Sequence, residues 1–344
     1  MRGPEEIDGK IRALRERHGS ELLILGHHYQ RDAVLAHADE RGDSLELARK
    51  AAARKDAKRI VFCGVRFMAE SADILTGPEQ AVYMPAPAAG CPMARMADAE
   101  SMRRAWSDLN AVSDDWLPVV YVNSTTEVKA CCGAWGGSAC TSSNAGRVFE
   151  WVFKQGKKIL FLPDEHLGVN TACDLGLAPD EVCVYDPRLP NGGLTTEAMR
   201  RARVAVWKGF CLVHAAFTVE AVHEVRRVRP GAKIIVHPET PRPVVELADA
   251  HGSTSQIIDY VKNAPSGSEI VIGTEQNLVQ RLAEEERGRL TVKSLIPIVC
   301  ANMAKTHARD LLTLLQDWPE DGRVTVPETV AEPARHALET MLSL

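Results

Sequence analysis

Residues 21–30, ELLILGHHYQ, join an apolar run to a polar tail, and the same pattern returns twice along the chain. The second copy is WLPVVYVNST (116–125), and the third is KIIVHPET (233–240). A short apolar run that ends in polar residues is typical of a buried parallel strand whose carboxyl end opens onto a ligand site. The three copies therefore predict three successive strand–helix units of one kind.

Nine apolar runs are interpreted as strands, in three sets of three. They are 22–25, 60–62 and 82–84; 119–122, 159–162 and 182–184; 234–236, 270–272 and 294–298. Amphipathic segments separate them, a pattern that favours parallel sheets covered by helices on both faces. The predicted fold class is α/β, with three three-layer αβα domains that contain small parallel sheets.

The chain has 344 residues, which fits two or three domains, and the tripled pattern favours three. We expect a first domain over 1–90 plus 301–344, a second over 91–210 and a third over 211–300. The stretch from Pro327 onward predicts a closing helix that packs back on the first domain. A triangle of domains with strand ends pointing inward would surround one central cavity.

Composition excludes several classes of protein. Hydrophobic residues make up 45% and charged residues 25%, as in ordinary globular proteins. No apolar run approaches the roughly 20 residues of a spanning helix, and the N-terminus, MRGPEEIDGK, lacks the apolar core of a secretory signal. A net charge of −5 without a basic block predicts no nucleic-acid partner. We expect a cytoplasmic protein with no membrane contact.

Each first strand carries two polar residues of the same parity beyond its end. Side chains at i and i+2 of an extended segment point the same way, so each domain can direct two functional groups at one point. The alternative is that these residues are ordinary strand-end caps. The pairs are His27 with Tyr29, Tyr121 with Asn123, and His237 with Glu239.

A hydroxyl-bearing segment that resembles a helix start follows each pair. The segments are GDSLELA at Ser44, TSSNA at Ser142, and GSTSQII at Ser253 and Thr254. Serine and threonine commonly cap helices, which is the simpler interpretation. Exposed amides at a helix start also bind anions, so three such starts around one cavity would hold carboxylates and a phosphate.

Three of the nine cysteines, Cys91, Cys211 and Cys300, each follow the third run of one unit. Their separations, 120 residues (91 to 211) and 89 residues (211 to 300), fit no zinc-finger spacing. Three thiolates brought together by folding can hold a cubane iron–sulfur cluster and leave its fourth iron open as a Lewis acid. The alternative is three unrelated buried thiols.

The other six cysteines divide into two groups. Cys63, Cys173 and Cys183 lie in or beside apolar elements and are interpreted as core residues. Cys131, Cys132 and Cys140 cluster in the glycine-rich stretch CCGAWGGSAC, which we expect to be a loop. A second metal or redox site, a regulatory disulfide and a plain flexible loop all remain open for it.

Ten motifs in order resemble the quinolinate synthase A family of bacterial NAD biosynthesis, over about residues 24–300. They are ILGHHYQ, GDSLELA, FCGVRFMAESADIL, VVYVNSTTEVKA, CTSSNA, LPDEHLG, CLVHAAFT, IVHPE, GSTSQII and IGTEQNLVQRL. The resemblance implies three homologous domains around a pseudo-threefold axis, with a [4Fe-4S] cluster bound by Cys91, Cys211 and Cys300. It implies condensation of iminoaspartate with dihydroxyacetone phosphate to quinolinate, with release of phosphate and water.

The resemblance also implies roles for the polar residues at the strand ends and helix starts. Tyr29 and Glu239 are the candidate acid–base residues. The nearby histidines are His27, His214 and His237. The candidate substrate-binding residues are His27, Ser44, Tyr121, Asn123, Ser142, His237, Glu239, Ser253 and Thr254. A transient contact with the enzyme that supplies iminoaspartate is an open expectation.

Two other functions remain alternatives. A non-catalytic cluster protein that senses oxygen or iron would need neither the inward-facing polar pairs nor the anion-binding helix starts, so these residues favour an enzyme. A different iron–sulfur hydro-lyase that acts on a small carboxylic acid would use the same open iron. The ligand distinguishes the two enzymes, because the condensing enzyme must hold two substrates together and the hydro-lyase holds one acid.

Overall fold

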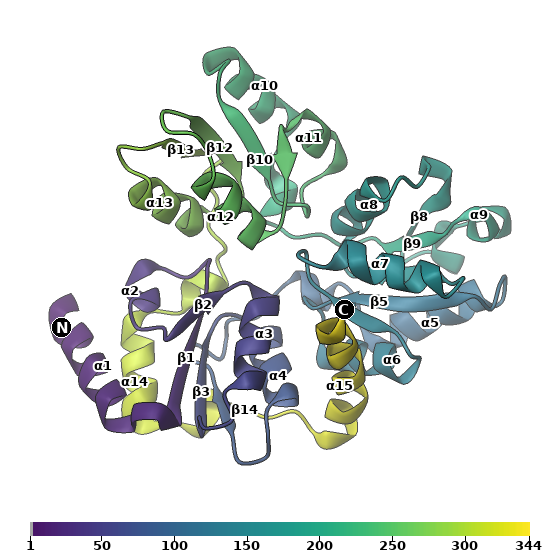
Figure 1. Ribbon diagram of the computed structural model, residues 1–344. Coiled ribbons are helices and arrows are strands. Elements are labelled where there is room, and N and C mark those ends of the chain that lie inside the picture. The colour runs from purple at the N-terminus through teal and green to yellow at the C-terminus, as the bar shows by residue number, and fades with distance from the viewer. Residues whose placement is uncertain (1–2) are drawn as a thin grey trace.

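Three mainly parallel sheets, each flanked by helices, form three lobes around a common centre in the computed structural model, which describes residues 3–344 (Figure 1). The strands of the first sheet are β1 (Leu22–His27), β2 (Glu40–Gly42), β3 (Arg59–Cys63), β4 (Ala81–Tyr83) and β14 (Arg323–Val324). Its helices are α1 (Pro4–His18), α2 (Asp32–Leu35), α3 (Ser44–Ala53), α4 (Arg66–Leu75) and α14 (Ala308–Asp317).

The second and third lobes repeat this plan. The second contains α5 (Ala99–Asn110), β5 (Trp116–Tyr121), α6 (Thr126–Ala134), β6 (Ser138–Cys140), α7 (Ala145–Lys154), β7 (Lys158–Leu162), α8 (Glu165–Asp174), β8 (Val182–Tyr185), α9 (Thr196–Arg201) and β9 (Val204–Trp207). The third contains α10 (Val219–Val228), β10 (Lys233–Val236), α11 (Arg242–Leu247), β11 (Ala250–His251), α12 (Thr254–Lys262), β12 (Glu269–Gly273), α13 (Gln276–Glu285) and β13 (Thr291–Ser294).

The three sheets share one strand order. The common part is β2-β1-β3-β4 in the first sheet, β6-β5-β7-β9 in the second and β11-β10-β12-β13 in the third, and all of these neighbours pair in parallel. The first sheet adds β14, antiparallel to β4, and the second adds β8 beside β9. The α/β class predicted from the apolar runs is thus confirmed.

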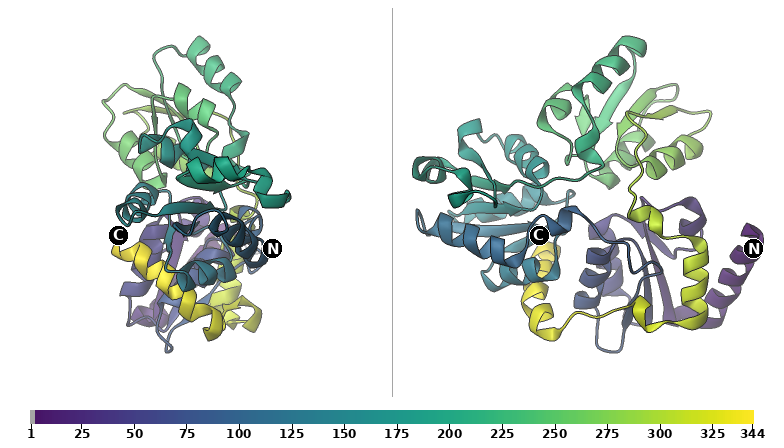
Figure 2. Two further views of the ribbon diagram at one scale, coloured as in Figure 1. Left: turned by 90° about the vertical axis from the view of Figure 1, so that its right-hand side faces the viewer. Right: turned by 180° about the vertical axis from the view of Figure 1, so that it is seen from behind.

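Helices flank each sheet, and successive residues of a strand point to its opposite faces. Apolar residues on both faces are therefore buried. In β1, Leu22 and Ile24 pack with residues of α1 and α14, while Leu23 and Leu25 join the core cluster on the opposite face. The linker after β13 carries the chain from the third lobe back to α14 in the first (Figure 2). The exact domain boundaries stay a prediction.

The observed strands differ from the predicted runs in three ways. The short strands β2, β6 and β11 were not predicted, because their residues (ERG, SAC and AH) form no apolar run. The run 182–184 is the added edge strand β8, and the strand that precedes Cys211 is β9. The last strand of the third lobe, β13, ends at Ser294, where the predicted run began.

The C-terminal helix α15 (Glu328–Ser343) does not pack on the first lobe alone, as was expected. It lies mainly against α6 of the second lobe and also contacts α4 of the first (Figure 1). Its backbone approaches α6 so closely that a Cβ at Gly133 would lie 1.9 Å from the Pro333 carbonyl oxygen. The helix therefore bridges two lobes.

The segment from Cys131 to Cys140 is not the loop that was predicted. Cys131 and Cys132 lie in helix α6, Cys140 ends strand β6, and all three side chains are buried. The strand β6 pairs with β5, which explains why this glycine-rich stretch is ordered. Accessible thiols for a regulatory disulfide are thus absent from this part of the described chain.

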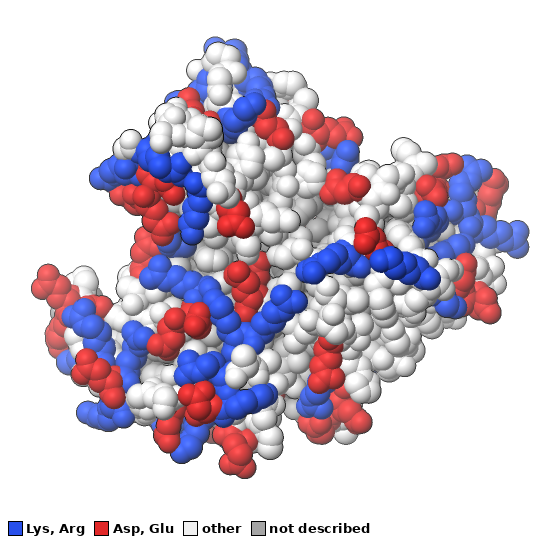
Figure 3. All heavy atoms as spheres, in the orientation of Figure 1, with Lys and Arg blue, Asp and Glu red and all other residues white. Residues whose placement is uncertain are grey.

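Acidic and basic side chains are interspersed over the face shown in Figure 3, and no charge of one sign covers it. This mixed face agrees with the absence of a basic block in the sequence. Among residues 3–344, none of the helices combines the length and apolarity needed to cross a membrane.

Candidate functional site

The carboxyl ends of the first strands of all three lobes face one cavity of about 270 Å³. Every residue singled out from the sequence as a site residue lines it, except Ser253. Those lining residues are His27, Tyr29, Ser44, Cys91, Tyr121, Asn123, Ser142, Cys211, His214, His237, Glu239, Thr254 and Cys300. Ser253 is fully buried and caps helix α12, where its hydroxyl accepts a hydrogen bond from the Gln256 N–H.

The three cysteines occupy equivalent places in the three lobes. Each lies beyond the fourth strand of the common order, and the carbonyl two residues earlier accepts a 2.8 Å hydrogen bond from the first residue of a helix. These bonds run from Arg66 N to Ala89 O, from Glu165 N to Gly209 O and from Gln276 N to Ile298 O. The same backbone geometry thus delivers one thiol from each lobe to the cavity.

A short 3₁₀ turn follows each cysteine. The capping residue of the next long helix lies seven positions after the cysteine. The caps are Asp98, Thr218 and His307, which follow Cys91, Cys211 and Cys300. In each turn, backbone N–H groups face the sulfur: those of Ala94 and Met93 face Cys91, that of His214 faces Cys211, and those of Met303 and Asn302 face Cys300.

The donor set fits an iron–sulfur cluster held by three corners. Burial raises the pKa of all three thiols, to about 12 for Cys91, so each thiol is neutral until a metal replaces its proton. N–H groups directed at cysteine sulfurs are a recurring feature around iron–sulfur clusters. Three thiols from three lobes around one cavity therefore suit such a cluster.

His27 and His237 have equivalent surroundings at the ends of β1 and β10. The Nδ1 atom of His27 accepts the Tyr29 N–H at 3.1 Å, and that of His237 accepts the Glu239 N–H at 3.3 Å. Burial lowers the pKa of both rings to about 3, so both are neutral and carry their hydrogen on Nε2. The paired residues are thus held by hydrogen bonds within each strand end.

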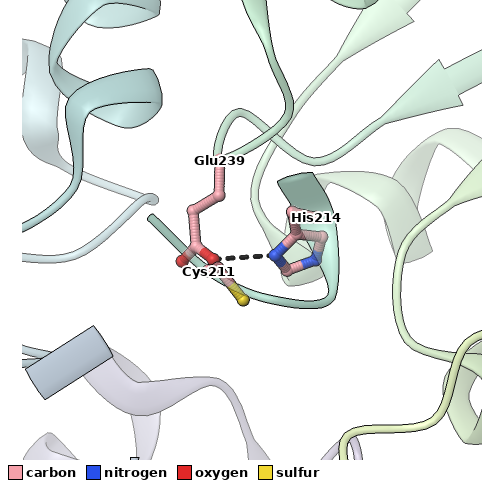
Figure 4. A group of neighbouring side chains, drawn as sticks. All are labelled: Cys211, His214 and Glu239. Atoms are coloured by element: carbon pink, nitrogen blue, oxygen red, sulfur yellow. Dashed lines mark hydrogen bonds and ion pairs between the residues drawn. The ribbon is translucent and has the colours of Figure 1, made fainter. Parts of the chain in front are cut away.

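Glu239 lies at the centre of a hydrogen-bonded chain. Its two oxygens accept hydrogen bonds from the Tyr121 hydroxyl and from His214 Nδ1, the latter at 2.7 Å (Figure 4). Ligand atoms of Cys211, His214 and Glu239 all lie within 4.8 Å of one another. Burial opposes ionisation of Glu239, but His214 and these hydrogen bonds outweigh it and hold the pKa of the carboxyl well below its usual range.

The chain continues from His214 to Tyr29 through Thr274. His214 Nε2 lies 3.1 Å from the Thr274 hydroxyl, which lies 2.8 Å from the Tyr29 hydroxyl. A carboxylate only accepts, so His214 donates from Nδ1. Between the Thr274 and Tyr29 hydroxyls either group can donate, and the Tyr29 oxygen accepts from Thr254 at 3.1 Å. Burial raises the pKa of Tyr29 well above its usual value, which keeps this phenol protonated.

Two of the three predicted helix starts adjoin the cavity directly. Ser44 and Thr254 are the first residues of α3 and α12, and both line the cavity. Helix α7 instead begins at Ala145, three residues beyond Ser142, so Ser142 lies in the turn before that helix. The partial positive charge of a helix start favours an anion at these two points, and at α3 the Asp43 carboxylate already accepts the amides of Leu45 and Glu46.

Asp43 joins the three lobes where these segments meet. It caps α3, and its Oδ1 accepts from the N–H groups of Leu45 and Glu46 at 3.0 Å. Its Oδ2 accepts the hydroxyl of Ser143 from the second lobe at 2.6 Å and that of Ser255 from the third at 2.7 Å. Burial alone would raise the pKa of Asp43, but these hydrogen bonds outweigh it and lower the pKa.

We expect Asp43→Ala to lower the free energy of unfolding of the apoprotein by about 3.5–8 kcal/mol, the sum of one helix cap and two hydrogen bonds to a charged group. Loss of a helix cap costs about 0.5–2 kcal/mol, and each hydrogen bond to a charged group contributes about 1.5–3 kcal/mol. Urea denaturation measures the change. Asp43→Asn is the matched control, because the asparagine oxygen caps a helix equally well while its NH2 group cannot accept the Ser143 and Ser255 hydroxyls. Equal losses in both variants would show that the charged acceptor for these two hydroxyls, rather than the helix cap, is what matters.

We expect His28→Gln to change how the stability of the apoprotein depends on pH. Burial lowers the pKa of His28 to about 4, whereas the unfolded chain takes up this proton near pH 6.5. The unfolded state thus binds more protons below pH 6.5, and this histidine destabilises the fold increasingly as the pH falls towards 4. The wild-type protein should lose about 1 kcal/mol per pH unit relative to the variant between pH 6.5 and 5. Parallel stability curves would contradict this.

Several residues at the site were not recognised from the sequence. Asp43 and Thr274 lie in quoted motifs, but the contacts that they make with other lobes leave no local pattern. Asp43 had a detectable signal, since Asp43 and Glu46 form a capping box with the D-x-x-E spacing. The spacing of seven residues from each cysteine to a helix cap was a second signal of the threefold repeat.

Comparisons with known proteins agree with the geometry. The sequence profile described as quinolinate synthetase A protein matches residues 9–343. The chain is 45% identical over 347 residues to the quinolinate synthase of Corynebacterium glutamicum, which covers 99% of this chain and 88% of that protein. It is 44% identical to the quinolinate synthase of Bacillus subtilis over 346 residues, with 99% and 94% of the two chains covered. The chain therefore belongs to the quinolinate synthase A family, a family of enzymes of NAD biosynthesis.

Proposed function

We propose that this enzyme condenses iminoaspartate with dihydroxyacetone phosphate to give quinolinate, with release of phosphate and water. The observation that carries the proposal is the meeting of one cysteine from each lobe with Glu239, His214 and Tyr29 around a single cavity. The proposal extends the family membership to the substrates and to the residues that act on them. Cytoplasmic location and transient contact with the enzyme that supplies iminoaspartate belong to the same proposal.

Cys91, Cys211 and Cys300 would hold a [4Fe-4S] cluster. When bound, the cluster supplies an open iron that acts as a Lewis acid towards a substrate oxygen or nitrogen. The buried thiols and the N–H groups that face them support this ligand set. Cys63 lies in strand β3 within the core between the sheet and helices α1 and α14, so it takes no part.

The polar lining of the cavity suits two anionic substrates. Asn123 and Ser142 are half-buried and belong to the second lobe, while Tyr121 donates from the same lobe. Asn123 and Ser142 would donate amide and hydroxyl hydrogens to carboxylates, and the Tyr121 and Thr254 hydroxyls would turn from Glu239 and Tyr29 to do the same. Ser44, at the first turn of α3, and the neutral His27, with its hydrogen on Nε2, would bind the phosphate-bearing substrate.

Glu239 and Tyr29 are assigned complementary proton-transfer roles. Glu239 is ionised and lies beside the Cys211 sulfur, so it would accept a proton at a carboxylate oxygen. Tyr29 is a protonated phenol whose oxygen already accepts from Thr254, so it would donate a proton to a leaving or developing oxygen. His214 and His237, stacked at 4.2 Å between ring centroids, support Glu239 from one side.

The direct test is to follow quinolinate formation by the anaerobically purified holoprotein. With iminoaspartate and dihydroxyacetone phosphate, we expect quinolinate and phosphate to appear in equal amounts. Holoprotein with about four iron and four sulfide per chain that forms no product would favour the alternative, an iron–sulfur hydro-lyase acting on one small carboxylic acid. A cluster protein that neither condenses nor dehydrates would favour the sensor.

A further inference from the structure

The segment that carries Tyr29 is held by a buried arginine of another lobe. Arg281 lies in α13 of the third lobe, and its side chain is 9% exposed. Its Nη1 donates to the His28 carbonyl at 2.8 Å, and its Nη2 donates to the Gln30 carbonyl at 2.6 Å. Its Nε donates to the Asp32 carboxylate at 2.6 Å. The guanidinium thus binds the backbone on both sides of Tyr29.

Two further residues of the third lobe contact Tyr29 itself. Asn277, in the first turn of α13, donates to the Tyr29 carbonyl at 3.2 Å. Thr274, which directly follows strand β12, lies 2.8 Å from the Tyr29 hydroxyl. A single strand–helix junction of the third lobe therefore positions both the backbone and the hydroxyl group of Tyr29.

Related contacts repeat around the pseudo-threefold arrangement. Asn170 of α8 lies six residues after the helix cap Asp164, as Arg281 lies six after the cap Glu275. Asn170 donates at 2.8 Å to the carbonyls of Pro238 and Thr240, which flank Glu239 in the third lobe. In the remaining pair of lobes, Glu70 of α4 accepts the Thr126 hydroxyl at 3.0 Å. In two of the three pairs of lobes, the helix after the third strand of the common order (α8 or α13) thus holds the strand-end segment of the next lobe, while α4 contacts the first residue of α6.

We propose that Arg281 is a positioning residue for catalysis, which sets the place of the Tyr29 phenol in the cavity by binding the carbonyls of His28 and Gln30. The proposal rests on the acid role given to Tyr29 above. Its physical basis is that a planar guanidinium donates in three fixed directions, which a lysine ammonium cannot reproduce across two carbonyls and a carboxylate. Docking of the third lobe on the first would therefore complete the acid–base machinery.

The first experiment compares Arg281→Lys with Asp32→Asn in anaerobically purified holoenzyme. Asp32 is 69% exposed and receives only one of the three arginine contacts, so Asp32→Asn should leave kcat within about twofold of wild type. Arg281→Lys should lower kcat by about 10- to 100-fold, because a displacement of about 1 Å at a reacting group can cost this much. Iron and sulfide content and KM should stay close to wild type in both variants.

The second experiment separates positioning from general stability by a double-mutant cycle. If Arg281 acts through the Tyr29 hydroxyl, Arg281→Lys should slow turnover no further once that hydroxyl is removed by Tyr29→Phe. The proposal would be overturned if Arg281→Lys lowered kcat by the same factor in the Tyr29→Phe enzyme as in the wild-type enzyme. It would also be overturned if the Arg281→Lys enzyme had the kcat of the wild type.

Hydrogen exchange of the apoprotein provides a readout that does not depend on turnover. The Tyr29 and Gln30 amides donate to His27, and Arg281→Lys should speed their exchange while Asp32→Asn should not. Unchanged exchange at these amides would overturn the positioning role by itself. Full activity of Tyr29→Phe alone would instead refute the acid role of Tyr29, so failure of the proposed function and failure of this inference are distinguishable.

Discussion

Alanine substitution of Cys91, Cys211 or Cys300, one at a time, is expected to leave a folded protein that cannot hold a [4Fe-4S] cluster and has no measurable turnover. Each lobe contributes a single thiol to the cavity, so no cysteine of the same lobe replaces a lost ligand. Two remaining thiolates bind a cubane much more weakly than three. Iron and sulfide analysis after anaerobic reconstitution measures the loss.

Cys63→Ala is the matched control for these variants. Cys63 is fully buried in β3, and burial raises its pKa to about 12, so it behaves as a small apolar side chain. Its substitution should keep about four iron and four sulfide per chain and lower stability slightly. Equal cluster loss in the control, or a full cluster in any of the three ligand variants, would contradict the ligand assignment.

Glu239→Gln is expected to retain the cluster and to lower kcat by about 10²- to 10⁴-fold, the usual contribution of a positioned acid–base group. Tyr121 and His214 both donate to the carboxylate, and a glutamine amide offers only one oxygen to these two donors. The substitution therefore removes the negative charge and leaves one buried donor unpaired. Initial rates of quinolinate formation, with iron content measured in parallel, provide the test.

The matched control for this variant is Glu246→Gln on helix α11 of the same lobe. Glu246 is 57% exposed and pairs only with Arg242 across the helix surface, so its loss should change kcat by less than about twofold. Wild-type turnover in Glu239→Gln would remove Glu239 from the proton-transfer role. Loss of the cluster in Glu239→Gln would instead show that this carboxylate supports the ligand Cys211.

The larger elements of the fold follow from local patterns in the sequence. The runs that became β1, β5, β10 and β12 contain three or more buried apolar residues between amphipathic segments, which is how a strand covered on both faces appears in a sequence. The strands β2, β6 and β11 escaped prediction because each forms only two or three pairings against a first strand. Their existence depends on the neighbouring strand rather than on their own residues.

Placement of the C-terminal helix and of the glycine-rich segment depended on contacts that no local pattern records. Helix α15 lies on α6 because Gly133 allows the two backbones to approach closely. Helix α15 covers α6, the helix that contains Cys131 and Cys132. This packing buries a stretch whose composition is typical of a loop. Composition alone predicts exposure here, whereas tertiary packing produces burial.

By itself the sequence determined the threefold repeat, the class of sheet and the polar residues that each strand end presents, because these properties follow from hydrophobic period and from parity along an extended chain. Only the tertiary structure decided how the lobes hold one another. Three sets of contacts show this: Asp43 with Ser143 and Ser255, Thr274 with Tyr29 and His214, and Arg281 with the backbone beside Tyr29. The residues that each contact joins are at least 60 positions apart in the sequence. Such contacts form when separate lobes dock, and spacing within one segment carries no trace of them.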